Sequence, residues 1–282
     1  MIVSVASGKG GTGKTTVAVS LALALQADRA VQFLDCDVEA PNAHLFMKPK
    51  IDQSEAVYTP VPEIDESLCT HCGRCAEVCA YNALAVLKED VLVFSELCHG
   101  CGACSLFCPE SAIKETGKRI GVIESGRAGN IRFAHGRLDV GQAMSPPLIR
   151  ALKKKLDPGR IVVIDAPPGT SCPVIESMKR SDFCLLVTEP TPFGLHDLEL
   201  AAGAAREMNI PCGVVVNRAS LGGGDGEIRD FCAREKLPVL MAIPFDRRIA
   251  EAYARGQSLL EAFPAYRPEF LKLFAAIGLG SP

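Results

Sequence analysis

Short apolar runs alternate with longer helical patterns along most of this chain. The apolar runs have the length of strands that are buried on both faces of a parallel sheet. The pattern predicts strands at Ile2–Ala6, Val31–Asp35, Ile161–Ile164, Phe183–Thr188, Gly213–Val216 and Val239–Ile243. It predicts helices at Lys14–Leu25, Leu148–Leu156, Val174–Lys179, Leu195–Met208, Ile228–Lys236 and Arg248–Ala254. This alternation is typical of an α/β fold with a mostly parallel sheet and helices on both faces.

The alternation breaks at residues 58–117, where two prolines open a cysteine-rich block with short strands and turns. We expect a small inserted α+β domain there and a discontinuous main domain at residues 1–57 and 118–282. After the block, the segments Ile120–Ile123 and Ile131–Val140 are expected to form a return hairpin. This hairpin carries Gly126, Gly129 and Gly136.

Composition and charge narrow the classes of function. An apolar fraction of 48% in 282 residues supports a sizeable core. The net charge of −3 gives no basic surface for nucleic acid, and the run Lys153–Lys155 is interpreted as the solvated face of a helix. No segment resembles a signal peptide or approaches the roughly 18 apolar residues of a membrane span. We therefore expect a cytoplasmic protein without stable membrane insertion, in which the thiols stay reduced.

Eight cysteines lie in two runs that share the spacing C-x2-C-x2-C-x3-C and repeat at an interval of 29 residues. This spacing suits a [4Fe-4S] cluster, and in two-cluster ferredoxins the fourth cysteine of each run binds the other cluster. A zinc ribbon pairs two short knuckles and has no use for a third and fourth cysteine at these intervals. We therefore expect two [4Fe-4S] clusters, one on Cys69, Cys72, Cys75 and Cys108 and the other on Cys98, Cys101, Cys104 and Cys79.

A phosphate-binding loop of the pattern GxxxxGK[ST] stands between the first predicted strand and the first predicted helix. In this context backbone N–H groups point at phosphates, Lys14 supplies a cation and the Thr15 hydroxyl can bind Mg²⁺. The residues of the loop are Gly8, Lys9, Gly10, Gly11, Thr12, Gly13, Lys14 and Thr15.

Lys9, inside this loop, gives the pattern KGGxGKT, and Thr16 follows it. The pattern resembles the deviant Walker motif of the MinD/ParA superfamily of P-loop ATPases, which also includes the nitrogenase iron protein. In that class the early lysine reaches the phosphates of the opposite subunit. The resemblance therefore implies ATP or ADP as ligand and a nucleotide-sandwich dimer, of identical or paralogous subunits.

Two further segments resemble the switches of that class. Asp35 and Asp37 match switch I, in which the second aspartate orients the attacking water and the first lies near the metal. The segment Asp165–Ser171 matches switch II, so Asp165 is expected to hold Mg²⁺ through water and Gly169 to offer an N–H to the γ-phosphate. Asn217, Pro244 and Asp246 resemble the residues that read and flank the adenine.

Five cysteines lie outside the two runs and are expected to be core residues. Cys172 stands seven residues beyond Asp165, an offset that resembles a cluster ligand of the nitrogenase iron protein. That intersubunit cluster needs two cysteines from each subunit, and only one is evident, so Cys172 is interpreted as a buried thiol at a helix start. The other four are Cys36, Cys184, Cys212 and Cys232.

The whole chain resembles MinD-superfamily ATPases that carry an inserted ferredoxin domain. The resemblance implies a Mg²⁺-dependent ATPase whose nucleotide cycle gates electron transfer or cluster delivery to a redox or metal-cofactor protein. One alternative is a positioning or partitioning ATPase with structural or redox-sensing clusters. A second, an amidotransferase-linked ligase, would need a glutaminase domain for which the chain has no room.

Overall fold

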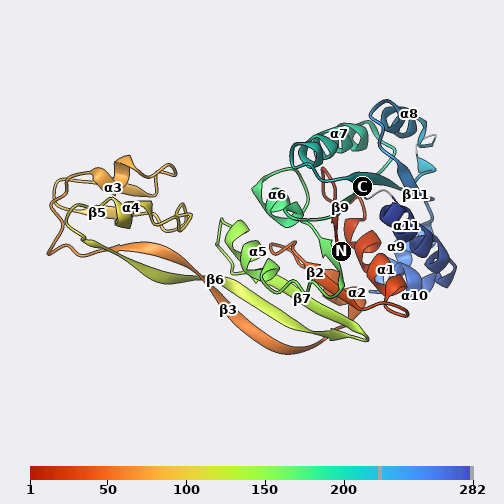
Figure 1. Cartoon of the computed structure of the whole chain (residues 1–282), viewed down its shortest axis with the longest axis horizontal. Helices are drawn as coiled ribbons and strands as arrows, with labels where there is room; N and C mark the ends of the chain where they lie inside the picture. The colour runs from red at the N-terminus through yellow and green to blue at the C-terminus, as the bar shows by residue number, and fades with distance from the viewer. Residues whose placement is uncertain (222–223, 280–282) are drawn as a thin grey trace.

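The computed structural model describes residues 1–221 and 224–279 and contains one large mixed sheet (Figure 1). Its strands are β1 Ile2–Ala6, β2 Val31–Asp35, β3 Lys50–Ile64, β6 Ile113–Ala128, β7 Ile131–Leu138, β8 Ile161–Asp165, β9 Phe183–Thr188, β10 Cys212–Asn217 and β11 Val239–Ile243. Their order is β11-β10-β9-β1-β8-β2-β7-β6-β3. The strands from β11 to β7 in this order are parallel to one another, and β6 is antiparallel to both of its neighbours, β7 and β3. The predicted α/β fold is therefore confirmed.

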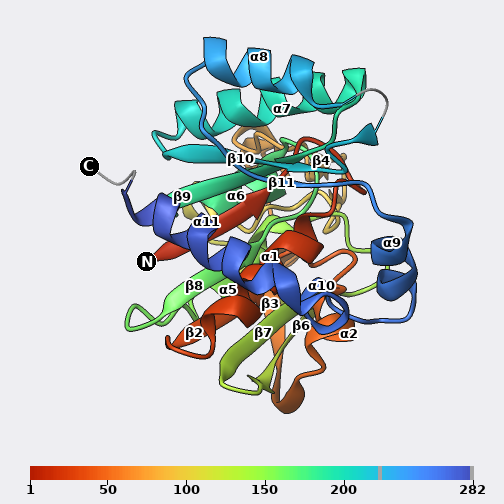
Figure 2. The same ribbon diagram turned by 90° about the vertical axis from the view of Figure 1, so that its right-hand side faces the viewer.

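Helices cover both faces of the parallel part of the sheet (Figures 1 and 2). One face packs against α1 Lys14–Leu25, α2 Ala43–Met47, α10 Leu259–Ala262 and α11 Arg267–Leu279. The other packs against α5 Pro146–Lys153, α6 Cys172–Met178, α7 Pro192–Glu207 and α8 Gly226–Arg234. A further helix, α9 Arg247–Ala254, follows β11. Because both faces are covered, the central strands read as continuous apolar runs in the sequence.

A long ribbon made by β3 and β6 connects the main domain to the insert (Figure 1). The two strands pair from Lys50 and Arg127 to Ile64 and Ile113, so residues 58 and 117 lie within them. The sequence pattern did not predict β3 because its first seven residues are all exposed and show no apolar alternation. As an edge strand, β3 can include prolines, which remove ladder donors.

Gly126 shows why the return hairpin carries glycine. A Cβ atom at this position would clash with the backbone carbonyl of Lys50 on the facing strand. The expected pairing of β6 with β7 is present, from Gly121 and Leu138 to Ala128 and Ile131. The hairpin is longer than predicted because β6 begins at Ile113, inside the ribbon.

The insert at the end of the ribbon is built from very short elements: α3 Arg74–Glu77, β4 Leu84–Val86, β5 Val91–Val93 and α4 Ala103–Leu106. Its few buried apolar side chains include Leu84, Val91 and Ile113, and the buried cysteines Cys75 and Cys104 pack among them. So small a core contributes little free energy of burial, and domains of this size usually need a metal or disulfides to be stable.

Helix α11 packs into the largest core of the main domain. Its residues Phe270, Leu273 and Ile277 are fully or almost fully buried there. Within residues 1–221 and 224–279, no helix is both long enough and apolar enough to cross a bilayer.

The interpretation of the lysine run 153–155 as a solvated helix face was wrong for Lys153. Its ammonium group donates to three backbone carbonyls at the end of α6, of Glu176, Ser177 and Lys179. Helix α5 places one lysine toward α6 and the next, Lys154, toward solvent. A charged side chain can be buried when it caps carbonyls that a helix end leaves without partners.

Candidate nucleotide and cluster sites

The phosphate-binding loop joins β1 to α1, and its glycines are required by the backbone. Gly11 and Gly13 have φ angles of +81° and +94°, which favour glycine. A Cβ atom on Gly8 would clash with the backbone of Asp197, and one on Gly13 with the side-chain amide of Asn217. The loop can therefore approach a phosphate group closely with its N–H groups.

A cavity of about 370 Å³ opens beside this loop and brings several predicted residues together. Its volume is that of a small-molecule site. The predicted residues that line it are Gly10, Gly11, Gly13, Lys14, Thr15, Thr16, Asp37, Asn217, Pro244 and Asp246. Phe245, which stands between Pro244 and Asp246 in the segment expected to flank the base, lines it too. Sequence reasoning missed Arg218 and Tyr253, which also line it, because neither belongs to a motif that a local pattern reveals.

Asp165 and Thr15 form the centre of the candidate magnesium site. The Thr15 hydroxyl donates to Asp165 Oδ2 at 2.6 Å, whereas Asp165 Oδ1 is buried and has no hydrogen-bond partner among the described residues. Burial raises the pKa of Asp165 to about 7, although Thr15 and Lys14 oppose the rise. A buried carboxylate with a free oxygen beside a hydroxyl is a donor set that suits Mg²⁺, which accepts only oxygen ligands readily.

Asp35 lies next to Asp165 across the β2–β8 pair and is fully buried. Its two oxygens accept backbone N–H groups of Asp37, Asn42 and Ala43, each at 3.1 Å. Burial, together with the charge of Asp165, raises the pKa of Asp35 well above its usual range. In this conformation Asp35 therefore organises the loop that carries Asp37.

Lys14 and Asp37 both line the cavity beside the phosphate-binding loop. Burial lowers the pKa of Lys14, while the carboxylates of Asp165 and Asp37 oppose that change. Burial likewise raises the pKa of Asp37, and Lys14 opposes it. The site therefore places one buried cation among acidic groups.

Lys9 is held within its own chain by an acid that the sequence reasoning did not single out. Its ammonium group lies 2.7 Å from Glu189, whose other oxygen accepts a bond from Arg218 at 2.6 Å. Burial opposes ionisation of Glu189, but its bond to Lys9 and the charges of Lys9 and Arg218 lower its pKa. Lys9 therefore points at an internal counter-ion in this conformation.

Three other predicted nucleotide residues already have partners in this conformation. The side-chain amide of Asn217 donates to the carbonyl of Thr12 at 2.8 Å, which ties β10 to the phosphate-binding loop. Asp246 caps α9 and pairs with Arg248. The Gly169 N–H donates to the carbonyl of Ser7 at 3.0 Å, so contact with a γ-phosphate would require switch II to move.

The eight cysteines of the insert line two separate cavities. The first is lined by Cys69, Cys72, Cys75 and Cys108, and the second by Cys79, Cys98, Cys101 and Cys104. Each cavity thus gathers three cysteines of one run and the last of the other, which is the grouping expected from the spacing.

The chemistry of these thiols fits a thiolate-bound cluster. Backbone N–H groups of Ala83 and Ala112 donate to the sulfurs of Cys79 and Cys108, both at 3.3 Å. Burial raises the pKa of Cys75 and Cys104, and the neighbouring thiols of the same set raise it further. Positively charged iron would offset this cost, because thiolate ligands bind metal in the deprotonated form.

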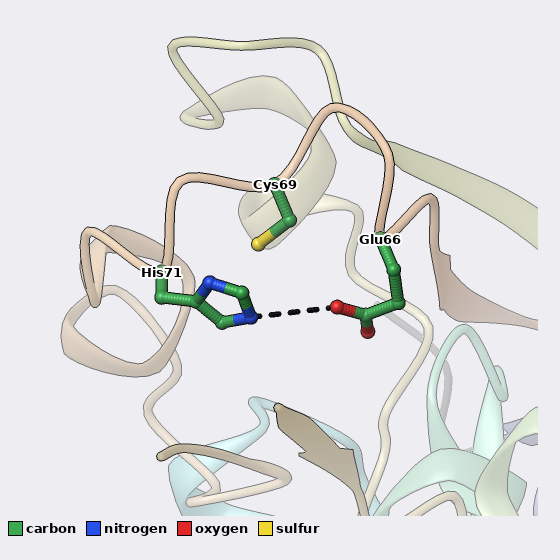
Figure 3. Close-up of side chains that lie close together, drawn as sticks. All are labelled: Glu66, Cys69 and His71. Atoms are coloured by element: carbon green, nitrogen blue, oxygen red, sulfur yellow. Dashed lines mark ion pairs between the residues drawn. The ribbon is translucent and has the colours of Figure 1, made fainter. Parts of the chain in front are cut away.

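Glu66 and His71 flank the first cluster cavity at Cys69 (Figure 3). The potential ligand atoms of the three residues lie within 4.8 Å of one another, and His71 Nε2 lies 3.4 Å from the Glu66 carboxylate. Since Cys69 belongs to the first set of four, this corner is part of that cluster site.

The expectation that Cys172 is buried was wrong, because it is exposed at the first residue of α6. The first turn of this helix follows switch II at the surface, so its side chain does not reach the core. Of the other four cysteines outside the runs, Cys36, Cys184 and Cys232 are buried, and Cys212 is half-buried.

The fold and the cavity define a P-loop nucleotide-binding protein. The chain belongs to the CobQ/CobB/MinD/ParA nucleotide binding domain family, whose model matches residues 3–260. Among solved structures, the septum site-determining protein MinD of Pyrococcus horikoshii, complexed with Mg-ADP, has a TM-score of 0.60 and 20% identity. That match covers 98% of this chain and 95% of that one, and it shows the fold alone.

Relatives in sequence include proteins named for iron–sulfur clusters. An uncharacterised protein of Methanocaldococcus jannaschii is 32% identical over 93% of this chain and 92% of its own length. An iron-sulfur cluster carrier protein of Aquifex aeolicus is 26% identical over 98% of this chain and 65% of its own length. A cytosolic Fe-S cluster assembly factor of Danio rerio is 24% identical over 93% of this chain and 87% of its own length.

Replacing Lys14 by alanine should remove nucleotide binding, because it deletes the buried cation of the phosphate site. Truncating one member of a buried charge pair costs about 2–5 kcal/mol, so we expect binding to weaken by about 30-fold to several thousand-fold. Calorimetric titration with ATP and ADP measures this change. Lys9→Ala is the matched control. Because Lys9 is paired with Glu189, this variant should leave nucleotide binding by a single chain intact. Equal losses of binding in both variants would contradict the assignment of Lys14.

Glu189→Gln should release Lys9 and favour ATP-dependent dimerisation. The ion pair is partly exposed, so its loss is worth roughly 1 kcal/mol and the dimerisation constant should rise about fivefold. Analytical ultracentrifugation with ATP tests this, with the exposed Glu207→Gln as control. A Glu189→Gln variant that dimerises no better than Glu207→Gln would show that Glu189 does not restrain Lys9.

Proposed function

We propose that this chain is an ATP-hydrolysing iron–sulfur protein whose nucleotide cycle gates electron transfer or cluster delivery to a partner metalloprotein. The observation that carries the proposal is the presence, in one chain, of a nucleotide cavity and two cavities with four cysteines each. The ribbon that bears the cysteines is an extension of the sheet that forms the nucleotide site. The relatives named as a cluster carrier and a cluster assembly factor support the same reading.

Hydrolysis in this proposal depends on positioning and charge. Phosphoryl transfer passes through a loose transition state, so the protein supplies cations around the γ-phosphate and an in-line water. Lys14 and a Mg²⁺ ion held at Thr15 and Asp165 supply charge, and Asp37 orients the water. Lys9 leaves Glu189 and adds a cation to the second subunit of a dimer, which is either identical or paralogous.

The clusters and their partner complete the proposal. Each set of four cysteines would hold one [4Fe-4S] cluster, which carries one electron or serves as the delivered group. The insert is acidic, with seven acidic and two basic side chains in residues 65–112. We place the protein in the cytoplasm, where free thiols persist.

A positioning ATPase with structural clusters is the alternative. It is supported by the MinD fold, but a fold of this kind hosts several functions. Phe270, Leu273 and Ile277 of α11 are buried in the main domain, so in this conformation these side chains are not available to a membrane.

Protein purified without oxygen should contain about eight irons and eight sulfides per chain, two cubanes in all. Cys101→Ser, which removes an exposed member of the second set, should lower the iron content toward four. Cys172→Ser, an exposed cysteine outside both sets, should retain eight. Metal and sulfide analysis with visible spectroscopy measures this, and stoichiometric zinc without a brown chromophore would refute the clusters.

ATP should change the properties of a cluster relative to ADP. Asp37→Asn should keep ATP bound and trap the closed dimer, since it removes the water-orienting carboxylate but leaves the phosphate loop intact. In this variant we expect ATP to change the rate of iron release to a ferrous chelator by about 5- to 150-fold relative to ADP, the usual size of coupling between sites. Identical rates and reduction potentials with ATP and ADP would reject the gating function.

A further inference from the structure

Helix α5 lies where both switches and the ribbon meet. At its start, the hydroxyl of Ser145 donates to the carboxylate of Glu39 at 2.8 Å, two residues beyond Asp37 of switch I. One turn on, Leu148 packs against β6 and β7 at Gly121 and Gly136. At these glycines a Cβ atom would lie 2.9 Å and 3.3 Å from the Leu148 side chain.

The same helix is fastened to α6, the helix that directly follows switch II. Lys153 donates to the carbonyls of Glu176, Ser177 and Lys179 at 2.9, 2.8 and 2.5 Å. Arg150, one turn earlier, lies 3.7 Å from the Glu176 carboxylate. These contacts satisfy the C-terminal carbonyls of α6 with a side chain from α5, so a displacement of α6 pulls on α5.

On its other side α5 reaches toward the insert. Just beyond the helix, Lys155 pairs with Glu55 of β3 at 2.6 Å. Strands β3 and β6 continue from these contacts to Ile64 and Ile113, between which both sets of cysteines lie. Figure 1 shows the insert reaching back toward α5.

We propose that α5 transmits the nucleotide state from switch II to the ribbon that bears both sets of cysteines, and that Lys153 and Arg150 are the positioning residues that make α5 follow α6. The proposal rests on the nucleotide gating described above and assigns its route. Gly169 must move to meet a γ-phosphate, and α6 begins three residues later. The movement reaches Arg150 and Lys153 through the end of α6, and then the ribbon through Leu148 and Lys155.

The test compares two neighbouring lysines in full-length, cluster-loaded protein. Lys153→Met keeps the apolar stem and removes the donor, whereas Lys154→Met alters an exposed lysine that makes no side-chain bond within the described ranges. Both are made in the Asp37→Asn background, and iron release to a ferrous chelator is followed with ATP and with ADP. We expect the ATP-to-ADP ratio to fall to near one in Lys153→Met and to keep its parent value in Lys154→Met.

Because the loss of Lys153 leaves carbonyls of α6 without a donor, a second test uses the more exposed Arg150–Glu176 pair. Arg150→Glu alone should reduce the ratio several-fold, and the exchange Arg150→Glu with Glu176→Arg should restore it. ATP binding should stay within about twofold of the parent in every variant, since neither residue lines the nucleotide cavity.

The outcomes separate the route from the function. A parent protein with different rates in ATP and ADP, whose ratio survives both Lys153→Met and Arg150→Glu, overturns the role of α5 and leaves the gating function standing. A parent with no difference rejects the gating function and this route together.

Discussion

Two buried aspartates at the carboxyl ends of neighbouring parallel strands are the constraint on which the nucleotide site depends. Asp35 and Asp165 are paired across β2 and β8, and neither is accessible to water. Two carboxylates so close in a buried site oppose each other's ionisation. The structure resolves this conflict by giving them different partners: three backbone N–H groups for Asp35, and one hydroxyl with one free oxygen for Asp165.

This asymmetry assigns the two carboxylates different tasks. Asp35 builds the switch I loop and so sets the position of Asp37 relative to Lys14. Asp165 is left able to bind a cation, and the charge of a cation there would oppose the effect of burial that raises its pKa. The sequence placed both aspartates near the metal. The different role of Asp35 depends on the backbone N–H groups of Asp37, Asn42 and Ala43, whose directions are set only in the folded loop.

The sequence predicted the parallel strands well, since each is an apolar run that burial on both faces requires. It also predicted the sets of four cysteines that share a cavity, because their spacing is itself the ligand geometry. It did not predict β3, which has no buried face over its first half, nor the bonds of Lys153 to the end of α6 and the partner of Lys9. Those features depend on contacts between residues far apart in the chain, such as Lys9 and Glu189, for which a local pattern holds no signal.

Packing against the main domain limits how freely the ribbon can change its direction. Two antiparallel strands with exposed faces are joined by hydrogen bonds but have little to fix their direction beyond the sheet. Near the main domain, however, β6 packs on Leu148, and β3 is paired through Glu55 with Lys155. Both contacts come from α5 or the residues just after it, and α5 also holds the end of α6. The ribbon near the main domain is therefore packed against the same helix that holds the end of α6, so the proposed signal has a packed path to the ribbon and not only a chain connection.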